Sequence, residues 1–298
     1  MSVLLCDSNC ELWYSRLKEL GVDFISMPYT LEGTEYFYDL GEKTDFKYFY
    51  DSVRAGKTPI TSALNPENYK EIFSKYFERG EDVLYVSFSH AMSGTFNQLA
   101  VALAELKEIY PDRKCTVFNT NGISLGAGVQ VEQAALLKQK GASDEEIIEF
   151  LKDYTNHVVL YFVVDDLMHL KRGGRLSGLA AFAGTVLQLK PVITVGADGA
   201  LAVFKKVSGK RKALSFIAER VADELENADA THPVYVLDAD SPADGDYMRD
   251  LILKSFPDAN VVRQPVGPVI GTHCGPGTIG VIFTAKKRAI PLANNTEE

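Results

Sequence analysis

The stretch from Val83 to Gln98 constrains the fold of this chain more than any other part of it. It opens with a short apolar run rich in Val, Tyr and Phe, which is typical of a buried strand. Small polar residues and a glycine follow, and apolar side chains then recur at helical spacing until Pro111: Phe96, Leu99, Leu103 and Leu106. A buried strand that turns tightly into a helix predicts an α/β fold.

Ser93, Gly94 and Thr95 lie where that helix is expected to begin. The first N–H groups of a helix carry partial positive charge, and neighbouring hydroxyls can donate hydrogen bonds. Gly94 would let a ligand approach the backbone closely. These residues therefore predict a site for a carboxylate or a phosphate. The alternative is that Ser93 only caps the helix, and this stretch alone does not decide between the two.

Other parts of the chain repeat the strand-to-helix pattern. Val3–Cys6 and Cys115–Phe118 are strand-like runs, each followed by polar residues and then by a helical pattern. From His157 onwards the character changes, and an Asp-Gly turn at 197–199 predicts an antiparallel hairpin. We therefore expect two α/β domains. Residues 1–157 would hold a largely parallel sheet flanked by helices, and residues 158–298 a mixed or antiparallel sheet with helices.

The composition narrows the classes of function. A net charge of −9 argues against a general nucleic-acid-binding protein. The four cysteines show neither a C-x-x-C pair nor zinc spacing, which favours a reducing environment. The N-terminus has no basic n-region, and the longest apolar run, Val158–Val164, is far too short to span a bilayer. We expect a cytoplasmic protein without a transmembrane segment.

Two further segments carry candidate ligand contacts. Thr61 and Ser62 are adjacent hydroxyls on a proline-restrained segment, and hydroxyls can hold a carboxyl group in either protonation state. The alternative is a turn before a helix that Asn65 caps. His273 lies in a stretch of glycines and prolines, Gly267–Gly280, which we expect to be a rigid loop. A histidine held on such a loop is a functional candidate, although a lone histidine is more often structural.

Metal and hydrolase chemistry are not favoured. Asp238 and Asp240 have a spacing that magnesium could use, but no matching carboxylates lie elsewhere in the sequence. We expect no metal site and no cofactor. We also expect no G-x-S-x-G elbow and no Asp partner for a histidine, which argues against a Ser-His-Asp hydrolase.

Basic residues gather at two places in this acidic chain. Arg172 and Arg175 bracket two glycines after a short helix with an acidic start, which Gly173 can end. They could meet a phosphate or an acidic partner. Lys205–Lys212 is a second basic patch that could dock a partner or a phosphorylated ligand. For both, the alternative is an ordinary solvated surface.

Together these motifs resemble the DegV family of bacterial fatty-acid-binding proteins of the FakB type, over nearly the whole chain. The motifs in order are Asp7-Ser8, Thr61-Ser62 with Asn65-Pro66, Ser93-Gly94-Thr95, Ser124-Leu125-Gly126 with Gly128, Asp166-Leu167 through Leu170-Lys171-Arg172-Gly173-Gly174-Arg175, Lys190-Pro191, and Gly271-x-His273-x-Gly275-Pro276-Gly277.

The resemblance implies a long-chain fatty acid in a tunnel between the two domains. Hydroxyls matching Thr61 and Ser93 would meet the head group, and His273 matches the family's loop histidine. The protein would not itself be a catalyst. It would present the acid to a separate, dihydroxyacetone-kinase-like fatty acid kinase, and we expect Arg172 and Arg175 to serve that encounter. Transient contact with a membrane surface is also compatible with this role.

Three positions depart from the family pattern. Asn119 stands where an aspartate is common, an arginine expected near Ser208 is absent, and His90 replaces a small residue. They bear on partner docking and ligand choice more than on the fold. One alternative function stays open, an acyl or phosphoryl transferase that acts on a lipid through Ser93 and His273.

Overall fold

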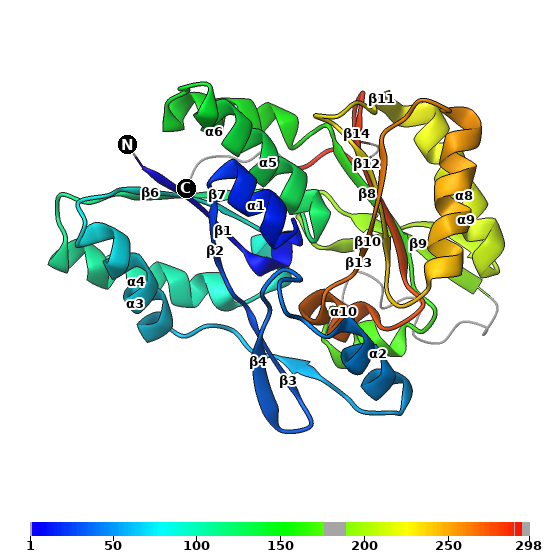
Figure 1. Ribbon diagram of the computed structural model, residues 1–298, viewed down its shortest axis with the longest axis horizontal. Coiled ribbons are helices and arrows are strands. Elements are labelled where there is room, and N and C mark those ends of the chain that lie inside the picture. The colour runs from blue at the N-terminus through cyan, green and yellow to red at the C-terminus, as the bar shows by residue number, and fades with distance from the viewer. Residues whose placement is uncertain (1, 176–188, 289, 294–298) are drawn as a thin grey trace. The chain divides into compact units, whose positions relative to one another are not determined.

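The computed structural model describes residues 2–175, 189–288 and 290–293, and the chain divides into two compact units (Figure 1). The first unit comprises Met1–Thr44 and Thr61–Thr155, and the second comprises Asp45–Ile60 and Asn156–Glu298. The predicted α/β class with one parallel and one mixed sheet is confirmed. The division differs from the single cut predicted after residue 157, because residues 45–60 belong to the second unit.

The first unit is built on a four-stranded parallel sheet with the order β2-β1-β6-β7. Its strands are β1 (Val3–Asp7), β2 (Asp23–Ile25), β6 (Val83–Ser87) and β7 (Cys115–Asn119). The chain leaves β1 towards β2 on one side and leaves β6 towards β7 on the other. The carboxyl ends of β1 and β6 therefore flank a topological switch point, where open α/β sheets bind ligands.

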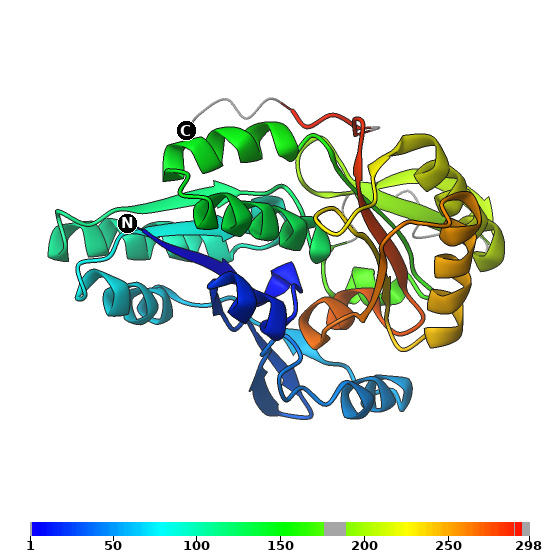
Figure 2. The same ribbon diagram turned by 45° about the horizontal axis from the view of Figure 1, so that its top comes forward.

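Helices cover both faces of this sheet. The view in Figure 2 places α5 and α6 on one face and α3 and α4 on the other. The helical segments are the 3₁₀ turns η1 (Ser8–Cys10) and η2 (His90–Met92), and α1 (Tyr14–Leu20), α3 (Pro66–Phe77), α4 (Thr95–Ile109), α5 (Leu125–Gln139) and α6 (Asp144–Tyr154). A third sheet has the order β4-β3-β5, from β3 (Pro28–Leu31), β4 (Thr34–Phe37) and β5 (Ile60–Thr61).

Local sequence signals set several helix ends. Asn65 caps α3 by accepting a hydrogen bond from the Asn68 N–H at 2.9 Å, and the Asn68 side chain accepts from the Asn65 N–H. A capping box at Ser143 and Glu146 starts α6 in the same reciprocal way. These signals act within one turn, so the sequence reveals them directly.

The second unit is built on a seven-stranded mixed sheet with the order β10-β9-β8-β14-β12-β13, and β11 pairs with β14. Its strands are β8 (Val158–Val163), β9 (Leu189–Val195), β10 (Leu201–Ser208), β11 (Leu225–Asn227), β12 (Val234–Asp238), β13 (Val261–Pro265) and β14 (Ile279–Ala285). The pairs are antiparallel except β12 with β13. The hairpin predicted at 197–199 joins β9 to β10, and Gly199 has the positive φ of 78° that this turn uses.

Two long helices, α8 (Lys210–Glu224) and α9 (Pro242–Ser255), complete the core of the second unit. Apolar side chains of α8, α9 and the sheet form one buried cluster, which includes Ile217, Met248 and Val281. The region 178–187, whose small apolar residues predict tight packing, lies outside the described residues.

Residues 45–60 join the second unit through α2 (Phe46–Arg54). The Tyr50 hydroxyl donates a hydrogen bond to the Val266 carbonyl at 2.7 Å, and Arg54 pairs with Asp240 at 2.6 Å. A Cβ atom on Gly271 would lie 2.7 Å from the Tyr50 hydroxyl and 3.0 Å from the Phe49 ring. A helix anchored by these contacts belongs with the second unit, although it comes early in the chain.

The prediction of a rigid loop over Gly267–Gly280 is wrong in its first half. Residues Pro268–Cys274 form a helix, α10. Pro268 occupies the first helical position, where its fixed φ favours a helix and its missing N–H is not needed. Gly275 follows the helix with a positive φ of 73°. The many glycines and prolines therefore mark the ends and the packing of a helix.

Among the described residues, no helix is long and apolar enough to cross a membrane.

Candidate functional site

Asp7 links the carboxyl ends of β1 and β6 at the switch point. Its buried carboxylate accepts hydrogen bonds from the Tyr85 hydroxyl at 2.8 Å and from the Asn9 N–H at 2.9 Å. The Phe88 N–H also points to it, at 3.5 Å. Burial raises the pKa of Asp7 to about 6, against these hydrogen bonds. Asp7 is thus a cap for η1 and links β1 to the end of β6.

The Ser93-Gly94-Thr95 segment begins α4 beside the end of β6. The Ser93 Oγ accepts a hydrogen bond from the Thr95 N–H at 3.2 Å, so Ser93 does act as a cap. Its hydroxyl proton is not used by that bond and can be donated to a ligand. Gly94 is exposed, and no atom lies within 4 Å of where its Cβ would be. Thr95 is fully buried, and its hydroxyl is 2.9 Å from the Tyr69 hydroxyl.

These contacts divide the predicted anion site. Ser93 and Gly94 reach the surface at the start of a 15-residue helix, whereas Thr95 faces the interior between α3 and α4. Thr61 is half-buried at the end of β5, and Ser62 is exposed. All of these residues belong to the first unit, and their convergence on one ligand stays a prediction.

Two of the family departures contact each other beside Ser93. The His90 N–H donates to the Asn119 Oδ1 at 3.3 Å, and the same oxygen accepts from the Asn121 N–H at 3.0 Å. The His90 ring stacks on Phe96 with 3.8 Å between ring centroids. Burial lowers the pKa of His90 to about 4, so this ring is neutral at pH 7. Asn119 and His90 therefore form an uncharged pair close to Ser93.

In the second unit, the two glycine motifs pack against one another through α7 (Met168–Arg172) and α10. A Cβ atom on Gly173 would lie under 3.0 Å from the His273 ring. A Cβ on Gly275 would meet His169 in the same way, and one on Gly277 would meet Asp165. Each of these glycines therefore leaves the space that a side chain from the other segment occupies.

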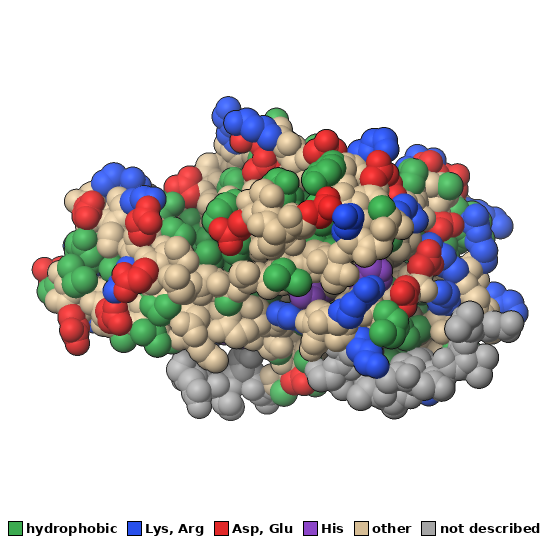
Figure 3. Space-filling view, turned by 90° about the horizontal axis from the view of Figure 1, so that it is seen from below, with side chains coloured by type: hydrophobic (Ala, Val, Ile, Leu, Met, Phe, Trp, Pro, Cys, Tyr) green, Lys and Arg blue, Asp and Glu red, His purple; other side chains and the backbone are tan. Residues whose placement is uncertain are grey.

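The basic groups of this α7–α10 cluster influence one another. Burial lowers the pKa of His273 to about 4, and the Arg175 charge contributes to that decrease. Burial also lowers the pKa of His169, with a contribution from Arg172. Histidine surfaces lie close to Lys and Arg side chains on the face shown in Figure 3. Neutral histidines beside guanidinium groups form a surface that favours an anion.

The two arginines of the cluster differ in exposure. Arg172 is exposed, and its Nε donates to the Met168 carbonyl at 3.3 Å. Arg175 is half-buried, its Nη1 donates to the Gly173 carbonyl at 2.5 Å, and burial lowers its pKa. Arg172 is therefore available to a partner, whereas Arg175 also holds the glycine turn.

Other sequence candidates are used internally. Lys210 of the basic patch pairs with Asp244 at 2.7 Å and Asp165 at 3.1 Å. Asp238 pairs with Arg263 at 2.6 Å, and Asp240 pairs with Arg54. Among the described residues, no group of three or more His, Cys, Asp or Glu side chains could hold a metal ion.

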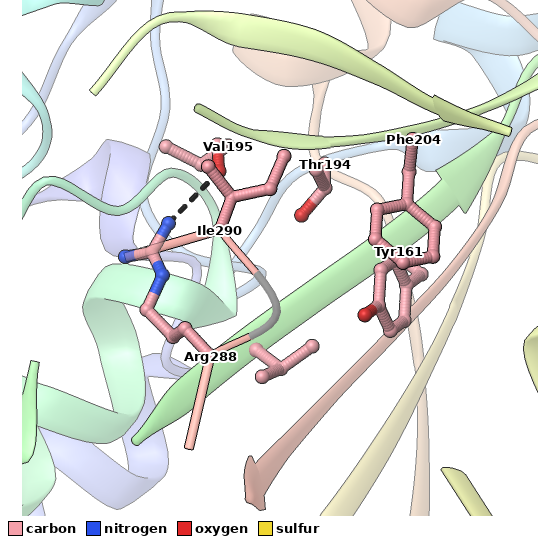
Figure 4. A pocket seen from close by; sticks show the side chains of 7 residues that line it. Tyr161, Thr194, Val195, Phe204, Arg288 and Ile290 are labelled. Atoms are coloured by element: carbon pink, nitrogen blue, oxygen red, sulfur yellow. Dashed lines mark hydrogen bonds between the residues drawn. The ribbon is translucent and has the colours of Figure 1, made fainter. Parts of the chain in front are cut away.

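A small pocket of about 10 Å³ lies in the second unit beside β8, β9 and β10 (Figure 4). Arg288 enters it from the segment after β14 and donates to the Val195 carbonyl at 2.9 Å. Burial lowers the pKa of Arg288 to about 10, so the guanidinium stays charged at pH 7. The lining is otherwise largely apolar: Val159, Tyr161, Thr194, Val195, Phe204 and Ile290. The hydrogen bond ties the segment after β14 to β9.

One residue with an unusual conformation, Ser124, is not among the sequence candidates. Ser124 has φ 56° and ψ −143° at the junction of β7 and α5. Its hydroxyl donates to the carboxylate of Glu11, and both residues are buried. The expectation of no G-x-S-x-G pattern is wrong, because Gly122-Ile123-Ser124-Leu125-Gly126 has this spacing. That spacing was the signal that could have identified the residue.

The chain belongs to the DegV family. The family model described as "Uncharacterised protein, DegV family" matches residues 2–286. A DegV domain-containing protein of Clostridium perfringens is 34% identical over 281 residues, which cover 94% of this chain and 96% of the relative. A DegV domain-containing protein of Lactococcus lactis is 31% identical over 95% of this chain and 98% of its own length.

Solved structures of the family share this fold and are described by their ligand. A DegV family protein from Thermus thermophilus, described as fatty acid binding, is 29% identical, with a TM-score of 0.80 over 95% of this chain and 99% of that one. DegV from Bacillus subtilis, described as a fatty acid binding protein, is 26% identical, with a TM-score of 0.81 over the same shares. These descriptions name a binding function and no enzymatic activity, in agreement with the expectation of a binding protein.

Proposed function

We propose that this chain binds a long-chain fatty acid and presents its carboxyl group to a separate fatty acid kinase, which forms the acyl phosphate. The observation that carries the proposal is the placement of Ser93 and Gly94 at the start of α4, beside the switch point of a parallel sheet. Open α/β sheets bind ligands at that position, and helix starts favour anions. The fatty acid binding described for the Thermus and Bacillus family members supports the same ligand class.

We propose that the Thr61 and Ser93 hydroxyls hold the carboxyl group, with Ser62 and Gly94 nearby and His273 beside the same head group. Burial of an acyl tail contributes about 0.8 kcal/mol per methylene, so a tail of about sixteen carbons supplies on the order of 10 kcal/mol before association costs. A carboxylate at a helix start adds only about 0.3–2 kcal/mol. The tail would therefore set the affinity, and the hydroxyls would set the orientation of the head group.

Native mass spectrometry of the purified protein tests the ligand class. We expect a co-purifying fatty acid, and we expect Ser93→Ala and Thr61→Ala to retain the fold and to bind palmitate more weakly. Ser255→Ala is the matched control, because Ser255 is an exposed serine at the end of α9 with no part in the proposed site. A ligand-bound structure with both hydroxyls beyond hydrogen-bond reach of the carboxyl group would refute the assignment.

The kinase step is tested separately, with the purified partner kinase and palmitate. His273→Ala should slow acyl phosphate formation more than it weakens palmitate binding. Arg172→Ala should slow the coupled reaction and reduce its salt dependence at an unchanged melting temperature, since Arg172 is exposed. Arg175→Ala should also lower the melting temperature, because Arg175 holds the Gly173 carbonyl. Full coupled activity of Arg172→Ala would contradict the docking role.

The alternative of a lipid transferase acting through Ser93 and His273 has no specific support. The hydrogen bond that Ser93 makes is to a backbone N–H of its own segment. Turnover of a lipid substrate by the purified chain without a partner would support that alternative.

A further inference from the structure

The turn from β7 into α5 has no part in the proposed fatty acid site. Its sequence, Gly122-Ile123-Ser124-Leu125-Gly126, has the spacing of a nucleophile elbow. In such an elbow, a serine lies on a sharp, strained turn between a strand and a helix. Here β7 ends at Asn119 and α5 begins at Leu125, so Ser124 lies at the corresponding point of the turn.

The backbone of Ser124 is strained as in an elbow. Its φ of 56° and ψ of −143° form a conformation that residues with a side chain rarely adopt, at a cost of about 1–3 kcal/mol. A Cβ atom on Gly122 would lie 2.7 Å from the carbonyl carbon of Gly126, so the turn depends on glycine there. A serine that only caps a helix does not need this strain, since Ser143 caps α6 with φ −70° and ψ 163°.

A carboxylate is placed as the base for this serine. The Ser124 hydroxyl donates its hydrogen bond to the Glu11 carboxylate. Glu11 is fully buried and follows η1 at the carboxyl end of β1, with a positive φ of 53°. A group that already accepts the Oγ–H bond can remove that proton as Oγ attacks an electrophile. The base is therefore a carboxylate rather than a histidine.

Two buried donors in the same unit have no hydrogen-bond partner among the described residues, the Tyr38 hydroxyl and the Trp13 indole N–H. The pKa of Tyr38 is raised by burial and then by the Glu11 charge, which places its phenol within electrostatic reach of the carboxylate. The Tyr14 N–H donates to the Leu40 carbonyl at 3.1 Å, which joins the segment of Trp13 to that of Tyr38. Buried donors without a partner are rare and require an explanation. An oxygen atom of a bound group would satisfy them.

We infer that Ser124 is a nucleophile that accepts an acyl group from an activated acyl donor of the thioester class. The Ser124 Oγ attacks the carbonyl carbon, and its proton passes to Glu11. The Leu125 N–H at the start of α5 and the Tyr38 hydroxyl are donors for the carbonyl oxygen as it becomes negative. The carbon–sulfur bond then breaks, the leaving thiolate takes the proton from Glu11, and the acyl group remains on Ser124 as an ester. The inference is independent of the proposed fatty acid site, because it uses neither Ser93 nor His273.

The test uses the full chain and an alkyl fluorophosphonate, in which a nucleophilic serine displaces fluoride from phosphorus. Intact-mass spectrometry should show one adduct, and peptide mapping should place it on Ser124. Glu11→Gln should slow labelling about 100-fold, the lower range for loss of a general base. Ser255→Ala, at the exposed end of α9, is the matched control and should label at the wild-type rate. Incubation with palmitoyl thioester should give the corresponding acyl adduct on the same serine.

Two variants separate reactivity from folding. Ser124→Ala removes the nucleophile, and Ser124→Gly does so while relieving the positive φ, because glycine adopts it without strain. Ser124→Gly should keep the near-ultraviolet circular dichroism of the wild type and lose all labelling. The inference is overturned if the wild type stays unlabelled under conditions that label a known serine hydrolase. It is equally overturned if the adduct lies on Ser93 or if Glu11→Gln labels at the wild-type rate, because Ser124 would then only satisfy the buried carboxylate.

Discussion

At the start of α4, Gly94 is exposed and no atom lies within 4 Å of where its Cβ would be. In the α7–α10 cluster, by contrast, Gly173, Gly275 and Gly277 each face a side chain closer than a Cβ atom would allow. Gly94 therefore leaves open space at the candidate anion site of the first unit, whereas side chains already cover the glycines of the second unit. We conclude that substitution of the first kind of glycine should affect ligand binding, and substitution of the second kind should affect folding.

Gly275→Ala should show the largest effect. Alanine would be strained at a φ of 73°, and its methyl group would overlap the His169 ring. We expect a loss of about 2–4 kcal/mol in the free energy of unfolding. Urea denaturation of the wild type and the variant measures it. An unchanged midpoint would show that His169 moves aside freely and that the cluster is not packed as described.

Asp7→Asn tests whether a buried carboxylate, rather than packing around glycine, makes the largest contribution to the unfolding free energy near the first unit's candidate site. The pKa of Asp7 rises from 3.8 to about 6 on folding, so the folded state binds the proton more tightly. The contribution of Asp7 to stability is thus full below pH 4 and is lost as the pH rises through 6. The asparagine variant lacks this dependence, so the difference in unfolding free energy should move in favour of the variant by about 2–3 kcal/mol from pH 4 to pH 7. Unfolding in urea at several pH values measures this difference, and a pH-independent result would contradict the raised pKa.

Gly173→Ala should destabilise by less, about 1–3 kcal/mol, because its φ of −73° suits alanine and only the contact with His273 is crowded. His273→Ala removes the crowded ring, so the double variant Gly173→Ala/His273→Ala should be more stable than the sum of the two single effects. Thermal unfolding of all four proteins gives the coupling energy. Simple additivity would mean that the two residues do not contact in solution.

Gly94→Ala should have the smallest effect on stability, within about 0.5 kcal/mol, because the position is open and its φ is −70°. Palmitate affinity should fall instead, since the methyl group occupies the approach to the start of α4. Isothermal titration and thermal unfolding of the same sample separate the two quantities. A large loss of melting temperature with unchanged affinity would reverse the comparison between the two units.

The sequence predicted what depends on near neighbours. The capping boxes at Asn65 and Ser143 and the hairpin at 197–199 follow from side chains within one turn. The helix over Pro268–Cys274 could not be predicted in this way, because glycine is a poor helix former. Gly271 is required by the Tyr50 side chain, which packs against it and is far away in the sequence.

The candidate site was predictable to a similar extent. The position of Ser93 at a helix start followed from the local pattern, whereas the buried role of Thr95 depends on Tyr69 in another helix. The contact of His90 with Asn119, and that of Ser124 with Glu11, join loops after different strands. Such contacts depend on the order of the strands in the sheet, which cannot be predicted from local sequence periodicity.

The assignment of α2 to the second unit has a consequence for the order in which the protein can form. Tyr50 and its acceptor Val266 are separated by 216 residues, so a ribosome has released α2 long before the carbonyl that holds it exists. During synthesis, the side chains of Phe49 and Tyr50 must remain without their final neighbours. Exposed apolar surface of this kind makes partly made chains prone to aggregation. A fragment ending at residue 157 would remain in that condition permanently.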